Sequence, residues 1–493
     1  MDIKSTSQSA VARPEDENLG VGANIAYGFQ HVLTMYGGII AVPLIVGQAA
    51  GLLPAEIGLL IAASLFIGGL ATLLQTIGVP FFGCQLPLVQ GVSFASVATV
   101  VAIVTTGGGL PSVFGAVIAA SALGFLITPI FSQIIKFFPP LVTGTVITTI
   151  GLTLMPVAAR WAMGGNSNLP TFGSMTNIGL AGFTLAMVLL LSKLGNAAIS
   201  RLSILLAMVI GTFAAWALGL VDFSGITTGS IFAFPSPFHF GMPTFEIAAI
   251  ISMFIVVLVI LVETSADILA VGDIIETDID SKRLGNGLRA DMAASMIAPI
   301  FGSFTQSAFA QNVGLVAVTG VKSRFVVAYA GIILVILGLM PIMGRVIATV
   351  PTAVLGGAGI VLFGTVAASG IRTLAQVSYT NNMNLIIVAT SIGFGMLPIA
   401  APAFYDQFPD WFATIFHSGI SSAAIMAIAL NLLFNHLKIG NSDQQSVFVA
   451  GTEDRSVRPV VMIDLYEGDY FTEGKLFDCD GKEIPISKEP AHH

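Results

Sequence analysis

The feature that most constrains this chain is a long stretch almost without charge. Between Asn18 and Ile135 the only formal charge is Glu56. A membrane-spanning helix needs about 20 apolar residues, so this stretch has room for about four spans. Charged residues make up 9% of the 493, against about 25% in soluble globular proteins. Since 55% of the residues are hydrophobic, the composition indicates an all-α polytopic membrane protein.

Several classes of protein are not indicated. Cys84 lies in an apolar stretch and Cys479 in a polar tail, which favours neither a disulfide framework nor a metal site. No feature suggests nucleic-acid binding. The polar, acidic start, Met1 to Asn18, lacks the basic start and short apolar core of a signal peptide.

Hydrophobic runs predict about fourteen spans, several of them short enough to be half-membrane elements. The predicted spans are 22–46, 55–78, 84–105, 110–134, 138–159, 176–192, 202–221, 244–275, 285–302, 305–320, 325–343, 350–369, 383–398 and 417–436. Residues 439–493 form a hydrophilic tail, in which Val460 to Ile463 and three glycines suggest a little β-structure.

The placement of Lys and Arg predicts the orientation, because cytoplasmic loops carry an excess of both. With fourteen spans and the N-terminus inside, the outer connections receive Arg160 and Arg345. The cytoplasmic connections receive Lys136, Lys193, Arg201, Lys282, Arg283, Arg289, Lys322, Arg324, Arg372 and Lys438. Both tails are therefore expected in the cytoplasm.

Two pairs of spans show similar sequence features, and the members of each pair are seven spans apart. The fifth begins at Pro139 with glycines at 144 and 151, and the twelfth begins at Pro351 with glycines at 356 and 364. The polar runs at 90–95 and 307–312 form a second pair, in spans three and ten. An odd offset inverts the topology of the second half, which is the layout of transporters built from inverted repeats.

Three carboxylates lie inside apolar segments. Glu263 and Asp267 are spaced i, i+4 and so share one face of a helix, and Asp291 follows on the next span. An intramembrane acid must pair, reach a water-filled cavity or hold a proton, and it is a functional residue by default. The alternative is a structural network in which Asp267 or Asp291 braces the bundle. The acidic run from Asp273 to Asp280 is interpreted as a solvated loop facing Lys282 and Arg283.

Two carboxamides, Gln311 and Asn312, stand in a glycine-broken span. A carboxylate plus a carboxamide can match the alternating N–H and C=O groups of an oxidised purine or a pyrimidine. The segments 93–95 and 309–311 are candidates for helix breaks that line a cavity. The alternative is that both amides bond across helices as packing contacts.

An early polar pair, Gln30 and His31, lies in the first span. A neutral imidazole there can relay protons or can be a hydrogen-bonded core histidine, and the residues leave both open. Phe94 can stack on a flat ring, although phenylalanine is too frequent in the chain for its type to decide.

The decamer Gln311 to Gly320, QNVGLVAVTG, matches the signature of the nucleobase–ascorbate (nucleobase:cation symporter-2) transporters. Gln30-His31, the Glu263/Asp267 pair and Asp291 fit the same family at its spacing, so the chain resembles that family over about residues 20–438. The resemblance implies fourteen spans in two inverted seven-span repeats, with short antiparallel strands in spans three and ten and a gate-mediated homodimer. It divides the chain into a cytoplasmic tail (1–20), a core domain (21–134 and 243–343), a gate domain (135–222 and 349–438) and a second cytoplasmic tail (439–493).

The resemblance also implies roles for single residues. Glu263 and Gln311 resemble the pair that hydrogen-bonds the purine, and Phe94 and Ala310 resemble positions that give stacking and backbone contacts. Ser93 fills a position where xanthine-selective members tend to have Asn and urate-accepting members Ser or Thr. Asn312 resembles a substrate-binding position tied to affinity and selectivity. Positions tied to coupling or site support are resembled by Gln30, His31, Asp267 and Asp291.

The resulting prediction is a proton-coupled symporter for urate and/or xanthine in the cell membrane, with no cofactor and with sodium as the alternative coupling ion. It is not an enzyme, and its partners are the purine and the lipid bilayer. One alternative is an anion transporter or channel on the same fold, which a fixed carboxylate at Glu263 disfavours because it repels anions. A uracil-type permease is disfavoured because it would have a second Glu in place of Gln311. A non-transporting sensor with a regulatory tail is a third possibility, and it ranks, like the anion transporter, below purine symport.

Overall fold

A computed structural model gives the fold of the chain. It describes residues 13–131, 139–167, 169–196, 199–200, 202–221, 223, 226, 230–379, 382–436, 469–472, 475–478 and 481–484. The predictions for the strand run at 460–463, for Cys479 and for Lys136, Arg201 and Lys438 lie outside the described residues.

The described chain is mostly helical. Its α-helices are α1 (Val21–Ala49), α2 (Pro54–Ile77), α3 (Val97–Ile103), α4 (Gly109–Ile127), α6 (Pro140–Ala162), α7 (Met175–Leu194), α9 (Ser203–Ala217), α10 (Ile247–Ile275), α11 (Ser281–Ile297), α12 (Ala310–Thr319), α13 (Arg324–Gly338), α14 (Pro341–Ala348), α15 (Thr352–Leu374), α16 (Asn382–Ala400), α17 (Asp410–Phe416) and α18 (Gly419–Asn431).

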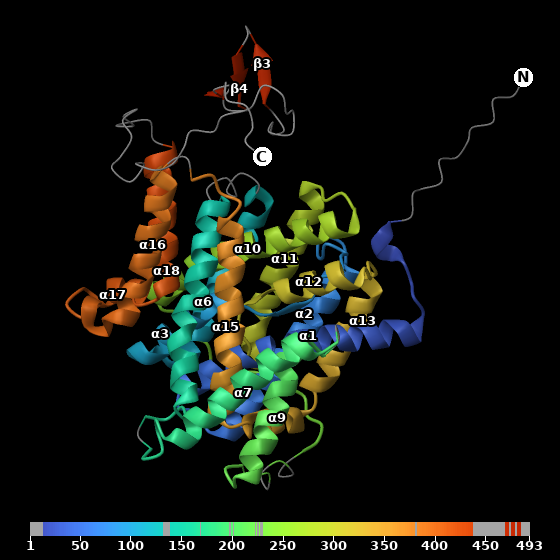
Figure 1. Cartoon of the computed structure of the whole chain (residues 1–493), viewed down its shortest axis with the longest axis vertical. Helices are drawn as coiled ribbons and strands as arrows, with labels where there is room; N and C mark the ends of the chain where they lie inside the picture. The colour runs from blue at the N-terminus through green and yellow to red at the C-terminus, as the bar shows by residue number, and fades with distance from the viewer. Residues whose placement is uncertain are drawn as a thin grey trace, which may run out of the picture.

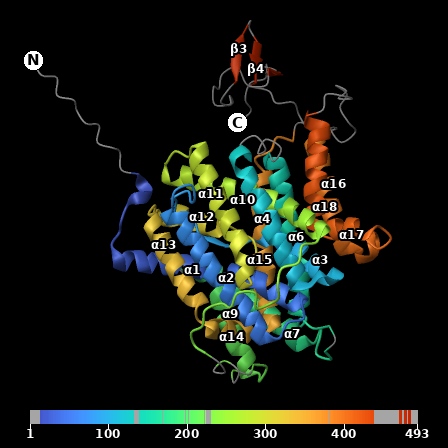
Figure 2. The same cartoon turned by 180° about the vertical axis from the view of Figure 1, so that it is seen from behind.

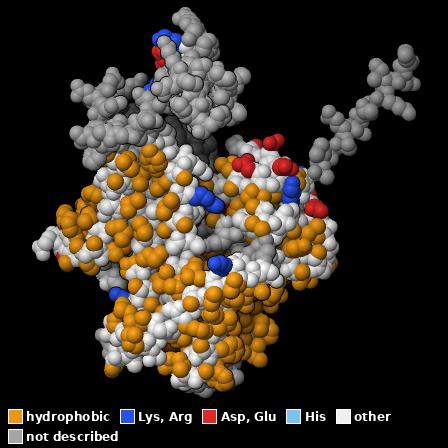
Figure 3. Space-filling view, viewed as in Figure 1, with side chains coloured by type: hydrophobic (Ala, Val, Ile, Leu, Met, Phe, Trp, Pro, Cys, Tyr) orange, Lys and Arg blue, Asp and Glu red, His pale blue; other side chains and the backbone are white. Residues whose placement is uncertain are grey.

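Eight helical stretches of the described residues are long and apolar enough to cross a membrane, and a bent pair would make nine. The protein is therefore a multi-pass membrane protein. One of the eight runs from Phe94 to Ile130 and is kinked at Gly107, whose φ of 101° lies in the left-handed region that favours glycine. Figure 3 shows hydrophobic side chains over most of the visible surface, with acidic ones gathered near one end.

Two features of the helices go beyond the predicted list of spans. The eleventh predicted span, 325–343, is not straight, because α13 and α14 meet at 79° just before Pro341, which cannot continue the helical ladder. The loop before the last predicted span, 417–436, contains the additional helix α17. Spans three and ten are helical only in part: each begins in extended chain and continues as the short helices α3 and α12.

The helices form two groups. In one group α13 packs along α1 and α2, while α4 packs along α10 and α11. In the other, α15 packs along α6 and α7, and α16 and α18 pack on α6. Both views of the chain show α16, α17 and α18 on one side and α11, α12 and α13 on the other (Figures 1 and 2).

Helices α6 and α15 approach each other closely and run antiparallel. A Cβ on Gly144 would lie 2.9 Å from the Leu374 backbone, whereas one on Gly356 would lie 2.2 Å from that of Ala162. Each glycine therefore meets the far end of the other helix, which fixes the opposite directions. These are the glycines that the sequence pairs between spans five and twelve.

Two three-residue strands lie inside the bundle. β1 (Gln90–Val92) pairs antiparallel with β2 (Gln306–Ala308), with Gln90 opposite Ala308. Gly91 stands at this crossing because a Cβ there would lie 2.6 Å from the Phe309 ring. In the C-terminal tail, β3 (Tyr470–Thr472), β4 (Lys475–Phe477) and β5 (Glu483–Ile484) form a small antiparallel sheet, so the tail contains β-structure, at positions other than the predicted run at 460–463.

Candidate substrate site

The strand pair is the centre of the candidate site, because it sets where α3 and α12 begin. The Ser93 N–H donates to the Thr305 carbonyl at 2.9 Å, and the Phe309 N–H donates to the Val89 carbonyl at 3.1 Å. These bonds extend the pairing past both ends of the strands. The chain then turns into a short 3-10 turn (Phe94–Ser96) before α3 on one side and into α12 on the other. Helix starts at membrane depth direct partial positive charge toward a ligand.

Helix α10 carries the two acids of the predicted pair. Asp267 is 8% exposed, and Glu263, one turn earlier, is half-buried. Among the described residues, neither Oε2 of Glu263 nor Oδ2 of Asp267 has a hydrogen-bond partner. Buried polar atoms in native proteins are normally paired. Two unpaired carboxylate oxygens on one helix face therefore point to a ligand or a proton at this place.

The first turn of α12 carries Ala310, Gln311 and Asn312, and its two amides differ. Gln311 is half-buried, as is Ala310, whereas Asn312 is 1% exposed. Helix α12 packs against α10, the helix that carries Glu263.

Asn312 turns to α1 instead. Its Nδ2 lies 3.1 Å from Nδ1 of His31 and donates to the His31 carbonyl at 3.0 Å. His31 is itself 2% exposed, so the two residues form an interior pair. Gln30, beside it, is half-buried, and its carbonyl accepts from the Thr34 hydroxyl at 2.9 Å.

Asp291 lies in a buried hydrogen-bond network rather than at an accessible surface. It is 1% exposed, and its Oδ2 accepts from the Thr264 hydroxyl at 2.6 Å. Its Oδ1 accepts from Nε2 of Gln75 at 3.1 Å. Thr264 and Gln75 were not predicted from the sequence as site residues. The only sequence feature that marks them is that each is a polar side chain inside an apolar span.

Phe94 belongs to an aromatic cluster between the two groups of helices. Its ring centroid lies 6.4 Å from that of Phe309 and 6.2 Å from that of Phe363 on α15. Phe363 in turn lies 6.0 Å from Trp161 on α6. Ser93, 1% exposed, accepts a bond from the Ala95 N–H at 3.2 Å and so caps the turn that holds Phe94.

Access to Glu263 differs between the two ends of α10. Toward Ile275, the residues on the Glu263 face are open: Ala266 and Asp273 are exposed, and Ala270 is half-buried. Their spacing of three and four residues places them on one side of the helix. Exposed or half-buried residues therefore follow Glu263 on this side of α10, although Asp267 among them is buried.

Toward the start of α10, Ser252 belongs to a set of buried polar contacts. The Thr99 hydroxyl on α3 lies 2.7 Å from that of Ser418, and the Ser252 hydroxyl on α10 lies 3.4 Å from that of Ser421 on α18. The Trp161 indole N–H on α6 also donates to Gln48 on α1 at 2.5 Å. These contacts join the two groups of helices beyond the strand pair.

The N-terminal segment occupies the end of the molecule where α10 finishes. Arg283, expected to face the acidic run, instead pairs with Glu15, which is fully buried. Within that run Glu276 pairs with Lys322 at 3.1 Å, and Asp280 accepts from the Arg283 N–H at 2.6 Å. The acids of this run are exposed, as the solvated-loop interpretation expects, and the Arg283 guanidinium also reaches the Asp278 carbonyl at 3.5 Å.

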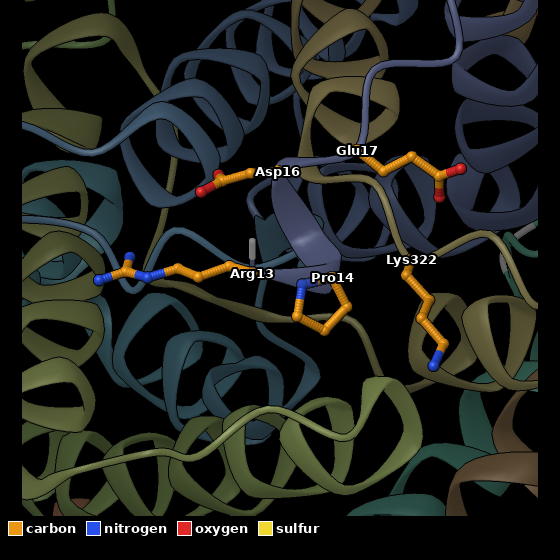
Figure 4. A pocket seen from close by; sticks show the side chains of 5 residues that line it. All are labelled: Arg13, Pro14, Asp16, Glu17 and Lys322. Carbon is orange, nitrogen blue, oxygen red and sulfur yellow. The ribbon is translucent and has the colours of Figure 1, made fainter. Parts of the chain in front are cut away.

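A surface hollow of about 370 Å³ lies beside this segment. Figure 4 shows its lining, Arg13, Pro14, Asp16, Glu17 and Lys322. None of the residues predicted for the site lines it. Among the described residues no group of three or more His, Cys, Asp or Glu side chains is placed to hold a metal ion.

A permease family model matches residues 22–404. The chain is 41% identical over 441 residues to the uric acid transporter UacT of Escherichia coli (strain K12), covering 88% of this chain and 91% of that protein. It is 39% identical over 416 residues to the xanthine permease of Bacillus subtilis (strain 168), covering 84% of this chain and 94% of that protein.

Solved structures share the fold at low identity. The transmembrane domain of the cyanobacterium bicarbonate transporter BicA matches with a TM-score of 0.54 and 15% identity, over 84% of this chain and 98% of that one. The murine Slc26a9 anion transporter in the inward-facing state matches with a TM-score of 0.57 and 13% identity, over 88% of this chain and 73% of that one. At such identities the likeness establishes the architecture and nothing about the substrate.

Proposed function

Because the chain belongs to the permease family that matches residues 22–404, the nucleobase:cation symporter-2 family, we propose that it imports urate and/or xanthine by symport with a proton. The family and these relatives are permeases, so the chain is a transporter and not an enzyme. The printed substrates of the relatives, uric acid and xanthine, support an oxidised purine as the cargo.

Glu263 and Gln311 hold the purine in this proposal. The observation that carries it is that Glu263 is half-buried with an unpaired oxygen, on a helix that packs against the half-buried start of α12. A carboxylate accepts from purine N–H groups, while the Gln311 carboxamide both donates and accepts. The start of α12 places partial positive charge near the same ligand.

Phe94 and Ser93 shape the other wall. The Phe94 ring, half-buried at the edge of its cluster, offers a face on which a flat purine stacks. Ala310 contributes backbone contacts, and Asn312 influences affinity through the position of α12. Ser93 is small, and a small residue at that place leaves room for the additional oxygen that distinguishes urate from xanthine.

Transport proceeds by movement of a core domain (21–134 and 243–343) against a gate domain (135–222 and 349–438). The two groups of helices support this division, since the main contacts of α13 and α4 lie in one and those of α15 and α16 in the other. Fourteen spans in two inverted repeats place β1 in the third span and β2 in the tenth. The antiparallel run of α6 and α15 supports the inversion. Both tails are cytoplasmic, and two gate domains form a homodimer.

The proton resides on the α10 acids in this proposal, with His31, Gln30 and Asp291 supporting the site. The unpaired oxygens of Glu263 and Asp267 are the observation behind it. Two like charges four residues apart on one helix repel each other, so a proton on one of them favours binding and movement. No cofactor takes part, and sodium is the alternative coupling ion.

Uptake of radiolabelled xanthine and urate tests the proposal in cells that lack their own purine carriers. We expect saturable uptake of at least one purine, with competition by the other and weak competition by uracil. Collapse of the proton gradient abolishes that uptake, and sodium does not restore it. Uptake of uracil with neither purine would refute the substrate, and full uptake without a proton gradient would refute the coupling.

A further inference from the structure

A single hydroxyl joins the two halves of the candidate site. Thr264 directly follows Glu263 on α10, and its Oγ1 accepts from the Ala308 N–H of β2 at 3.3 Å. Ala308 is the last residue of β2 and lies two residues before Ala310, where α12 begins. The Thr264 hydroxyl therefore connects the backbone that presents Glu263 to the backbone that presents Gln311.

The same hydroxyl is fixed in direction by Asp291. It donates to Asp291 Oδ2 at 2.6 Å, a length typical of a charge-assisted bond. Because a hydroxyl has one proton, donation to Asp291 leaves its lone pairs for the Ala308 N–H. Asp291 thus acts on β2 through Thr264.

Gln75 holds Asp291 from the other side. Its Nε2 donates to Asp291 Oδ1 at 3.1 Å and to the Gly287 carbonyl at 3.2 Å, while its Oε1 accepts from the Cys84 N–H at 3.0 Å. Gln75, Thr264 and Asp291 are at most 1% exposed, so water does not replace these bonds. The network ties α2, α10, α11 and β2 into one unit.

We propose that Thr264 is a positioning residue for purine transport, which sets the separation of Glu263 and Gln311 through its bonds to Asp291 and Ala308. The proposal rests on the proposed function, since it assumes that these two side chains hold the purine. Thr264 itself does not touch the substrate. A shift of about 1 Å between binding groups can lower the rate of a site by about 100-fold, so loss of the hydroxyl affects the site more than its size suggests.

Two substitutions separate the hydroxyl from the shape of the side chain. Thr264→Val keeps the volume and removes both bonds, whereas Thr264→Ser keeps the hydroxyl and removes a methyl group. The matched control is Ser265→Ala. Ser265 is the next residue on the helix and is 1% exposed, but its hydroxyl donates to Leu261 within α10 at 2.6 Å.

The experiment measures KM and maximal rate of xanthine and urate uptake, with the amount of each variant in the membrane determined by immunoblotting. We expect Thr264→Val to raise KM by about tenfold or more at unchanged membrane level, because a buried acceptor and a buried N–H lose their partner. Thr264→Ser and Ser265→Ala should stay within about threefold of the wild-type KM, since a loss below about 0.7 kcal/mol corresponds to that factor.

Three outcomes would overturn the proposal. The first is a Thr264→Val protein with the wild-type KM, and the second is equal impairment of Thr264→Val and Thr264→Ser. If Thr264→Val does not reach the membrane, Thr264→Ala replaces it, because alanine does not place a methyl group against the carboxylate. The third outcome is that neither Thr264→Val nor Thr264→Ala reaches the membrane while Thr264→Ser does. It would show that the hydroxyl is needed for folding and not for positioning.

Failure of the proposed function has a different signature. A wild-type protein that takes up neither purine refutes the function before any variant is compared. The Thr264 series is then measured with the nucleobase that the wild type does transport, and the same three outcomes decide it.

Discussion

Truncation of the two adjacent amides of α12, Asn312 and Gln311, is expected to affect two different properties of the protein. Asn312→Ala removes a side chain that donates to both Nδ1 and the carbonyl of His31, at 3.1 and 3.0 Å. Gln311→Ala removes a half-buried side chain on the accessible side of the same turn. The first change should destabilise the protein, and the second should weaken purine binding.

The size of the Asn312 effect follows from the two bonds. Each buried acceptor left without its donor costs about 1 to 3 kcal/mol, and the His31 carbonyl loses less because it has a second lone pair for its own helix. The free energy of unfolding should therefore fall by about 2 to 4 kcal/mol for Asn312→Ala. For Gln311→Ala the change should stay within about 0.5 kcal/mol, the usual range for sites without such bonds.

Thermal unfolding of the detergent-solubilised protein, measured beside xanthine and urate titrations, separates the two effects. We expect Asn312→Ala to melt at a lower temperature with a small change in affinity at temperatures where it is folded. Gln311→Ala should melt as the wild type does and bind the purine at least tenfold more weakly, which is about 1.4 kcal/mol. Wild-type stability in Asn312→Ala, or wild-type affinity in Gln311→Ala, would refute this division of roles.

Two further changes test other parts of the molecule. Ser93→Asn should narrow uptake toward xanthine, because the larger side chain fills the space proposed for the additional urate oxygen; unchanged urate uptake would count against that interpretation. Glu15→Ala should lower the free energy of unfolding by about 1 to 3 kcal/mol, because Arg283 loses its ion pair with the buried Glu15 carboxylate. The loss is limited because the Arg283 guanidinium still donates to the Cys84 and Gln85 carbonyls. Thermal unfolding measures the effect of Glu15→Ala. The control is Glu17→Gln, which changes an exposed acid in the same segment. Equal melting temperatures for the wild type, Glu15→Ala and Glu17→Gln would contradict the predicted role of Glu15.

Local sequence signals were enough to predict much of the fold. The nearly uncharged stretch before Ile135 predicted α1, α2 and α4 to within several residues, since an apolar helix of this length has few alternatives in a bilayer. The i, i+4 spacing placed Glu263 and Asp267 on one face, where the structure leaves an oxygen of each unpaired. Neither inference needed contacts between distant segments.

Distant contacts account for what the sequence did not predict. Thr264 meets Asp291, and Gln75 meets the same carboxylate across more than two hundred residues of chain. The hydrogen bond between Trp161 and Gln48 likewise joins residues that lie far apart in the sequence. A polar residue in an apolar span indicates that it has a partner without indicating which one.

Equilibrium binding of xanthine and urate to purified protein tests the role of Glu263 most directly. Glu263→Gln keeps the size of the side chain and removes its charge, and Asp273→Asn, at an exposed position of the same helix, is the matched control. Titration calorimetry should give purine binding to the wild type and to Asp273→Asn, and binding at least 100-fold weaker to Glu263→Gln, or about 2.7 kcal/mol. Wild-type affinity in Glu263→Gln would contradict the assignment of Glu263 to the purine.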